Sequence, residues 1–144
     1  MLLTVIIPFK DRAEEVTKRF FELHSLKNDI QLLLIDDGSL TETRTSLMKT
    51  NVYDFVEVRL QRNLGRMNAI RKSIPFIRGE FVCIADSDDP ILIENFKTLV
   101  KKILPICKIR KIHRIIAEPS KTYNLDLKKN HDIYLLYFCY KNHP

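Results

Sequence analysis

The stretch Glu80–Asp89, EFVCIADSDD, joins an apolar run to a dense acidic turn. The run Glu80–Ala85 has the composition of a strand, and the turn Asp86–Asp89 predicts where that strand ends. A helix is expected next, because Pro90 suits the first turn of a helix and the pattern continues to about Leu104. A strand, an acidic turn and a helix in this order are typical of one unit of an α/β sheet.

The same alternation extends toward the N-terminus. Three earlier apolar runs predict strands, and the first is continuous and β-branched, as in a strand buried on both faces of a sheet. Between and after these strands lie stretches with helical periodicity or helix-capping residues. The predicted strands are Leu2–Pro8, Ile30–Ile35 and Phe55–Leu60, and the predicted helices span about 11–26, 41–50 and 66–78. Ser39 or Thr41 is expected to cap the second helix, and Pro75 to bend the last turn of the third.

This alternating order predicts an α/β fold, a three-layer αβα sandwich with a mainly parallel, Rossmann-like sheet. No linker divides the chain, so residues 1–144 are expected to form a single domain. The pattern weakens after Pro105, where 111–117 and 132–140 resemble strands and 118–130 resembles a polar loop.

Composition favours a folded, cytoplasmic protein. Hydrophobic residues make up 45% of the chain, enough for a core, which argues against intrinsic disorder. The three cysteines are far apart and lack zinc-site spacing, which predicts reduced thiols. The apolar runs Leu2–Ile7 and Ile133–Tyr140 are too short to span a bilayer, and the first lacks the features of a signal peptide.

One basic segment accounts for the net charge. Residues 101–114 contain six lysines and arginines and no acid, which equals the net charge of +6. A solvated helix-and-loop face is one interpretation of this segment. Peripheral contact with an anionic membrane, at its inner face, is another. Nucleic acid is not expected as a partner, because no recognised binding motif or aromatic interleaving accompanies the charge.

The acidic turns at the ends of strands predict a metal-assisted ligand site. Parallel sheets bind ligands beyond the carboxyl ends of their strands, where Asp36–Ser39 and Asp86–Asp89 are expected. Crowded carboxylates repel one another unless a cation offsets their charge, and Mg²⁺ or Mn²⁺ prefers oxygen ligands. Asp86 and Asp88 are therefore the predicted metal ligands, whereas Asp89 is equally suited to cap the next helix. A plain turn remains the alternative for Asp36–Ser39.

A glycine-rich phosphate loop is not predicted. The only glycines are Gly38, Gly65 and Gly79, which form neither a dinucleotide-binding nor a P-loop spacing. A metal bridge to a diphosphate fits the sequence better than such a loop.

Five segments together resemble family 2 glycosyltransferases of the GT-A fold. They occur in the family's order over residues 2–104 and are Val5–Arg12, Leu34–Ser39, Asn63–Gly65, Gly79–Phe81 and Asp86–Asp89. The resemblance implies a nucleotide-sugar-binding half of such an enzyme. It also implies an inverting transfer of sugar from a UDP-sugar to a glycan or lipid-linked acceptor, with Mn²⁺ or Mg²⁺ as cofactor.

The resemblance further implies roles for individual residues. Asp37 would accept a hydrogen bond from the base, and Asp86 and Asp88 match the family's metal-binding DxD motif. The full set implied to bind the nucleotide-sugar is Pro8, Phe9, Lys10, Asp11, Asp37, Asp86 and Ser87.

The chain also departs from the family. Lys10 stands where the family often has an aromatic residue. Residues Ala69–Arg71 read Ala-Ile-Arg where the family often has Ala-Arg-Asn. The family's arginine is therefore displaced by one position in this chain, or Arg66 takes its place. The family's acceptor half and catalytic base lie beyond the DxD motif, and that half is almost entirely missing here. The catalytic base is therefore unassigned, and a binding module without a complete active site is the alternative function.

Overall fold

The computed structural model describes residues 3–50, 56–60, 62–88, 93–105 and 136–137. These residues form a five-stranded sheet with the order β3-β2-β1-β4-β5, and each pairing is parallel. The strands are β1 (Leu3–Phe9), β2 (Ile30–Asp36), β3 (Val56–Arg59), β4 (Phe81–Ile84) and β5 (Leu136–Tyr137). The predicted parallel sheet is confirmed, and β5 lies within the late apolar run 132–140.

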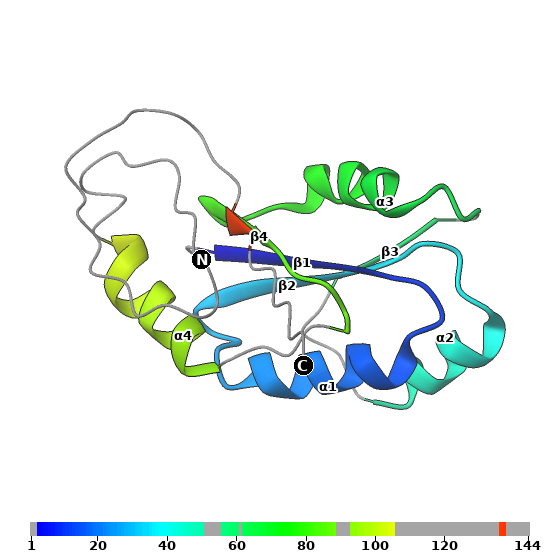
Figure 1. Ribbon diagram of the computed structural model, residues 1–144, viewed down its shortest axis with the longest axis horizontal. Helices are drawn as coiled ribbons and strands as arrows, with labels where there is room; N and C mark the ends of the chain where they lie inside the picture. Colours follow the sequence, from blue (N-terminus) through cyan, green and yellow to red (C-terminus); the bar gives the residue numbers. More distant parts are fainter. Residues whose placement is uncertain (1–2, 51–55, 61, 89–92, 106–135, 138–144) are drawn as a thin grey trace, which may run out of the picture.

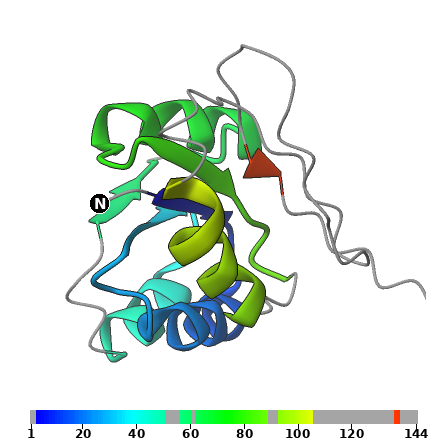
Figure 2. The same ribbon diagram turned by 90° about the vertical axis from the view of Figure 1, so that its left-hand side faces the viewer.

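Helices cover both faces of the sheet, as the sandwich prediction requires. Among the helices that the structure describes, Figures 1 and 2 show α3 on one face and α1, α2 and α4 on the other. The helices are α1 (Ala13–His24), α2 (Thr41–Met48), α3 (Arg66–Ser73) and α4 (Ile93–Thr98), which continues into a π-helical segment, η2 (Leu99–Ile103). The result is a three-layer α/β fold with the sheet in the middle.

The central strand β1 is buried on both faces. Val5, Ile7 and Phe9 join the larger core cluster beneath α1 and α4, whereas Ile6 joins the smaller cluster beneath α3. Successive side chains of a strand point to opposite faces, so this continuous apolar run supplies both clusters at once. Cys83 of β4 is buried in the larger cluster as a thiol, whereas the other two cysteines lie outside the described residues.

Two helix boundaries differ from the sequence expectations. The third helix ends at Ser73 and continues as a 3₁₀ turn, η1 (Ile74–Phe76), because Pro75 cannot sustain the α-helical hydrogen bonds. The prediction that Ser39 or Thr41 caps α2 is wrong, since Leu40 is the residue at the cap position and no side chain of the helix caps it. Ser39 instead accepts a hydrogen bond from the backbone of another loop.

The basic segment 101–114 lies largely outside the described residues. Lys101 and Lys102, at the end of η2, are exposed. In the part of the chain that the structure describes, no helix is both long and apolar enough to cross a bilayer.

A buried polar network ties the turn after η1 to the sheet. The Thr4 hydroxyl donates to Gln31 Oε1 (2.8 Å), and the Gln31 amide donates to the Phe76 carbonyl (2.7 Å). The backbone N–H groups of Arg78 and Gly79 donate to Gln31 Oε1 (2.7 Å) and Thr4 Oγ1 (2.8 Å). Because Thr4 and Gln31 are buried and their polar atoms are all paired within this partly buried network, it holds β4 in place beside β1.

Gly79→Ala should destabilise the protein by about 3 kcal/mol, at the upper end of overpacking costs. A Cβ at this position would lie 2.5 Å from the Thr4 nitrogen and 2.6 Å from the Leu3 carbonyl carbon, and neither backbone atom can move without shifting β1. Urea unfolding monitored by circular dichroism measures the effect. Gly65→Ala is the control for a glycine-to-alanine change without a steric clash. Its φ of +87° is strained for alanine, but the added Cβ meets nothing within 4 Å. A wild-type midpoint for Gly79→Ala would contradict the packing argument.

Candidate functional site

The strand order creates a switch point between β1 and β4. The chain runs outward from β1 through β2 to β3, then returns to the other side of β1 to form β4 and β5. Ligands of open α/β sheets bind beyond the carboxyl ends of the strands at such a point. The segments that follow β1 and β4 here are Lys10–Arg12 and Asp86–Asp88. The acidic turn predicted as a ligand site therefore flanks the switch point.

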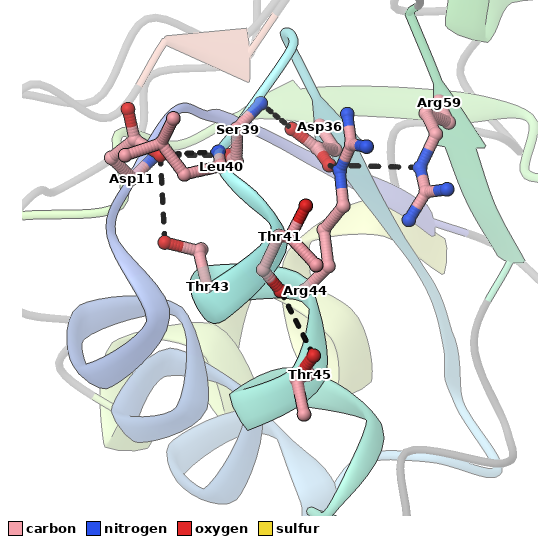
Figure 3. A network of polar contacts seen from close by, with 9 residues as sticks. All are labelled: Asp11, Asp36, Ser39, Leu40, Thr41, Thr43, Arg44, Thr45 and Arg59. Carbon is pink, nitrogen blue, oxygen red and sulfur yellow. Dashed lines mark hydrogen bonds and ion pairs between the residues drawn. The ribbon is translucent and has the colours of Figure 1, made fainter.

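Asp36, the last residue of β2, is a structural anchor. Its carboxylate is fully buried and accepts hydrogen bonds from the Ser39 N–H (2.6 Å) and from Arg44 Nε (3.0 Å). Arg59, its partner in the β2–β3 register, places its Nε 4.0 Å away. Figure 3 shows both arginines reaching toward this carboxylate, with a dashed line to Arg59. These contacts hold the turn after β2 against α2 and β3.

Asp37 faces the opposite side of the sheet from Asp36. The neighbouring strand residues alternate between the two core clusters, so the paired aspartates diverge. The Asp37 N–H donates to the Phe9 carbonyl (2.8 Å), and its carboxylate accepts the Leu64 N–H (3.0 Å). Asp37 is 6% exposed, and it binds the loop before α3 to the turn after β2.

Gly38 allows that loop to approach closely. Its φ of +80° lies in the left-handed region, and a Cβ there would lie 2.8 Å from the Asn63 backbone nitrogen. A side chain would therefore meet both conformational strain and a backbone clash. This glycine sets the distance between the turn after β2 and the loop that leads into α3.

Asp11 clamps the loop after β1 to the start of α2. Its backbone N–H donates to Ser39 Oγ (2.8 Å), and its carboxylate accepts the Leu40 N–H (2.7 Å). Thr43 Oγ1 lies 3.5 Å from the same carboxylate oxygen. Figure 3 shows these contacts beside the Asp36 anchor. Asp11 holds a φ of +52°, which is uncommon outside glycine, and the contacts on both its backbone and its side chain maintain that conformation.

The other predicted residues of the first loop differ in exposure. Pro8 is buried within β1, and Phe9 is 4% exposed and packs in the larger core cluster. Lys10 is exposed at the sheet edge. Phe9 therefore has two roles. Its carbonyl accepts the Asp37 N–H at the end of β1, and its ring packs in the core.

Arg66 contacts Asp86, and Arg12 senses the charge of Asp88. Arg66 Nε donates to Asp86 Oδ1 (2.8 Å), and Arg66 Nη2 lies 2.6 Å from the same oxygen. Arg12 bonds Glu15 (2.9 Å), which raises the pKa of Arg12, and the negative charges of Glu15 and Asp88 raise it further. Asp88 is exposed, and Ser87 between the two aspartates is buried.

The structure thus brings four segments together at the carboxyl ends of the strands: the loop after β1, the turn after β2, the loop before α3 and the turn after β4. Asp37 contacts Leu64 in the loop before α3, and Asp86 contacts Arg66 at the start of α3. The negative charge of Asp88 raises the pKa of Arg12 in the loop after β1. Among the described residues, no three histidine, cysteine or carboxylate side chains gather closely enough to hold a metal ion by themselves. Two carboxylates on one turn nevertheless provide the oxygen donors that Mg²⁺ or Mn²⁺ takes together with substrate phosphates. The donor set at Asp86 and Asp88 therefore fits such an ion.

Sequence reasoning missed the pairing of the aspartates with arginines. The alternation of side chains along β2 was the available signal that Asp36 and Asp37 serve different faces. Nothing in the spacing identified Arg44 as the partner of Asp36 or Arg66 as the partner of Asp86, because those contacts depend on how α2 and α3 pack against the sheet.

The three-layer sandwich, with acidic turns beyond the carboxyl ends of its parallel strands, is an α/β domain of the GT-A fold. Residues 4–137 match the family described as Glycosyl transferase family 2. This chain belongs to that family.

Similar proteins agree with this assignment. A cholesterol galactosyltransferase of Borreliella burgdorferi is 30% identical over 91 residues, covering 62% of this chain and 25% of that protein. The crystal structure of S. aureus TarS 1–349 superposes with a TM-score of 0.62 at 21% identity, over 88% of this chain and 39% of that one.

A third relative was solved with ligands. Glucosyl-3-phosphoglycerate synthase from Mycobacterium tuberculosis, in complex with Mn²⁺, UDP-glucose and phosphoglyceric acid, has a TM-score of 0.54 at 18% identity. The alignment covers 71% of this chain and 40% of that structure. This chain thus spans between a quarter and two fifths of the proteins it resembles.

Proposed function

We propose that this chain is the donor-binding domain of an inverting glycosyltransferase. It binds a UDP-sugar through Mn²⁺ or Mg²⁺, and the sugar is transferred from this donor to a glycan or lipid-linked acceptor. The observation that carries the proposal is the position of Asp86 and Asp88, which follow β4 at the switch point of a family 2 domain. We further propose that residues 1–144 all belong to this one domain.

Asp86 and Asp88 would hold the ion. Bound there, it would offset the negative charge that grows on the diphosphate as the nucleotide leaves. The relative solved with Mn²⁺ and UDP-glucose supports this role, because its fold is shared with this chain. Ser87 and the loop after β1, with Lys10 and Asp11, complete the proposed surroundings of the diphosphate-sugar.

Asp37 would recognise the base. A carboxylate has about four lone-pair sites, so Asp37 can accept a second donor beside the Leu64 N–H. The ring N–H of uracil is such a donor. Phe9 holds the backbone of Asp37 in position, since its carbonyl accepts the Asp37 N–H at the end of β1, and Pro8 precedes it in the same strand.

The catalytic base stays unassigned. The late acids Glu118, Asp126 and Asp132 lie outside the described residues. The alternative is a module that holds the nucleotide-sugar without turnover, and release of UDP from a UDP-sugar separates the two. Membrane contact through residues 101–114 stays a prediction, as does a cytoplasmic location at the inner membrane face.

Titration calorimetry with UDP tests the donor site. We expect UDP to bind at least about tenfold more tightly with Mn²⁺ than with a chelator, a difference of about 1.4 kcal/mol. GDP is the control ligand, because it has the same diphosphate but a different base, and it should bind more weakly than UDP. Equal UDP affinity with and without metal would overturn the metal bridge. Equal affinity for GDP would overturn the assignment of Asp37 to uracil.

A further inference from the structure

The carboxylate predicted to bind the metal is already engaged by a guanidinium. Two nitrogens of Arg66 lie within 2.8 Å of one oxygen, Asp86 Oδ1. Both side chains are about one third exposed, at 37% and 34%, so the contact is at the surface of the site and open to an incoming ligand. Charge-assisted hydrogen bonds of this kind are stronger than neutral ones.

The protein holds this arginine in place through its backbone. Arg66 is the first residue of α3 and follows Gly65, whose φ is +87°. Two residues earlier, Leu64 is bound to the Asp37 carboxylate, and the preceding residue, Asn63, packs against Gly38. The loop that delivers Arg66 to Asp86 is therefore the same loop that contacts the proposed base-binding residue.

A divalent ion at Asp86 must share that carboxylate with a positive guanidinium. Two like charges a few ångströms apart repel, so the arginine opposes binding of the metal alone. A diphosphate brings compensating negative charge, and its oxygens accept hydrogen bonds from guanidinium as well as from a metal.

We propose that Arg66 makes metal and nucleotide binding interdependent: it competes with the cation for Asp86 until a diphosphate arrives to accommodate both. The inference rests on the proposed donor site and adds a positioning residue to it. In thermodynamic terms, Arg66 increases the coupling between the two ligands, and the coupling is reciprocal.

Arg66→Met tests the proposal, with Mn²⁺ binding to the nucleotide-free protein as the first measurement. The electron paramagnetic resonance signal of unbound Mn²⁺ reports that affinity without any turnover. We expect Arg66→Met to bind Mn²⁺ several-fold more tightly than wild type, by about fivefold or more, because a repelling charge is removed. The factor by which Mn²⁺ tightens UDP binding should fall by a similar amount.

Two further variants separate this role from a structural one. Lys72→Met removes an equal charge from an exposed position on the same helix and should leave both quantities unchanged. Arg66→Lys retains the positive charge and should keep Mn²⁺ affinity closer to wild type than Arg66→Met does. A structural role alone would lower both affinities together, with a lower unfolding midpoint.

The outcomes distinguish the inference from the function on which it rests. If wild type binds both Mn²⁺ and UDP, but Arg66→Met binds Mn²⁺ with unchanged or weaker affinity, the competition proposal is overturned. If wild type binds neither ligand, the donor site itself is wrong. Tighter Mn²⁺ binding by Arg66→Met, together with reduced coupling to UDP, supports the inference.

Discussion

Asp88→Ala should abolish the Mn²⁺-dependent part of UDP binding while leaving the protein folded. Asp88 supplies one of the two carboxylates of the proposed metal site, and an ion held by few protein ligands loses most of its affinity when one is removed. The side chain is exposed, so its loss should change the free energy of unfolding by less than about 0.5 kcal/mol. Titration calorimetry with and without Mn²⁺, together with thermal unfolding, measures both expectations.

A charge-matched control makes the result specific. Glu42→Ala removes one negative charge from an exposed position in the first turn of α2, away from the acidic turn. It should retain the full Mn²⁺ dependence of UDP binding. If Asp88→Ala also retained that dependence, the assignment of Asp88 as a metal ligand would be wrong.

Asp36→Asn should destabilise the protein by about 3 kcal/mol, the range seen when one partner of a buried ion pair is removed. The fully buried carboxylate faces Arg44, and an amide in its place would turn N–H groups or a weaker acceptor toward that guanidinium. The bond from the Ser39 N–H would weaken as well, because its acceptor loses charge. Urea unfolding gives the free-energy difference.

A double-mutant cycle with Arg44→Met isolates the pair. The two single changes should not add, since each leaves the other partner without its main contact, and a coupling of at least about 1 kcal/mol is expected. Asp37→Asn is the neighbouring control and should cost less stability, because its remaining oxygen can still accept the Leu64 N–H. It should instead weaken UDP binding. An Asp36→Asn variant as stable as wild type would contradict the anchor role.

These two predictions divide the aspartates into those with a structural role and those with a proposed role in ligand binding. Asp36 and Asp11 are engaged in holding loops together, and substitutions there should act mainly on stability or on the shape of the site. Asp86 and Asp88 lie at the switch point with exposed surface, and substitutions there should act on ligand binding. The sequence presents all four as acids that follow strands, so the distinction comes from their contacts.

Much of the fold follows from local patterns in the chain. Continuous apolar runs such as Leu3–Phe9 are buried on both faces, and helical stretches alternate with them, so a parallel sheet covered by helices was predictable. The break at Pro75 also followed from one residue, because proline lacks the backbone N–H that a helix needs. The resemblance to the family was also visible in the sequence, because each of the five motifs is a short contiguous segment and their order along the chain can be read directly.

The pairing of side chains at the sheet edge has a different origin. Asp36 meets Arg44 because α2, which directly follows β2, packs its arginine against the end of that strand. Asp86 meets Arg66, 20 residues earlier in the chain, only because β4 returns beside β1 on the strand order β3-β2-β1-β4-β5. The alternation along β2 predicts that adjacent aspartates diverge, but not which cations they reach. Local sequence therefore specified the strands, helices and acidic turns, whereas the tertiary arrangement assigned each carboxylate its partner, because distance through space depends on strand order and on how the helices pack against the sheet.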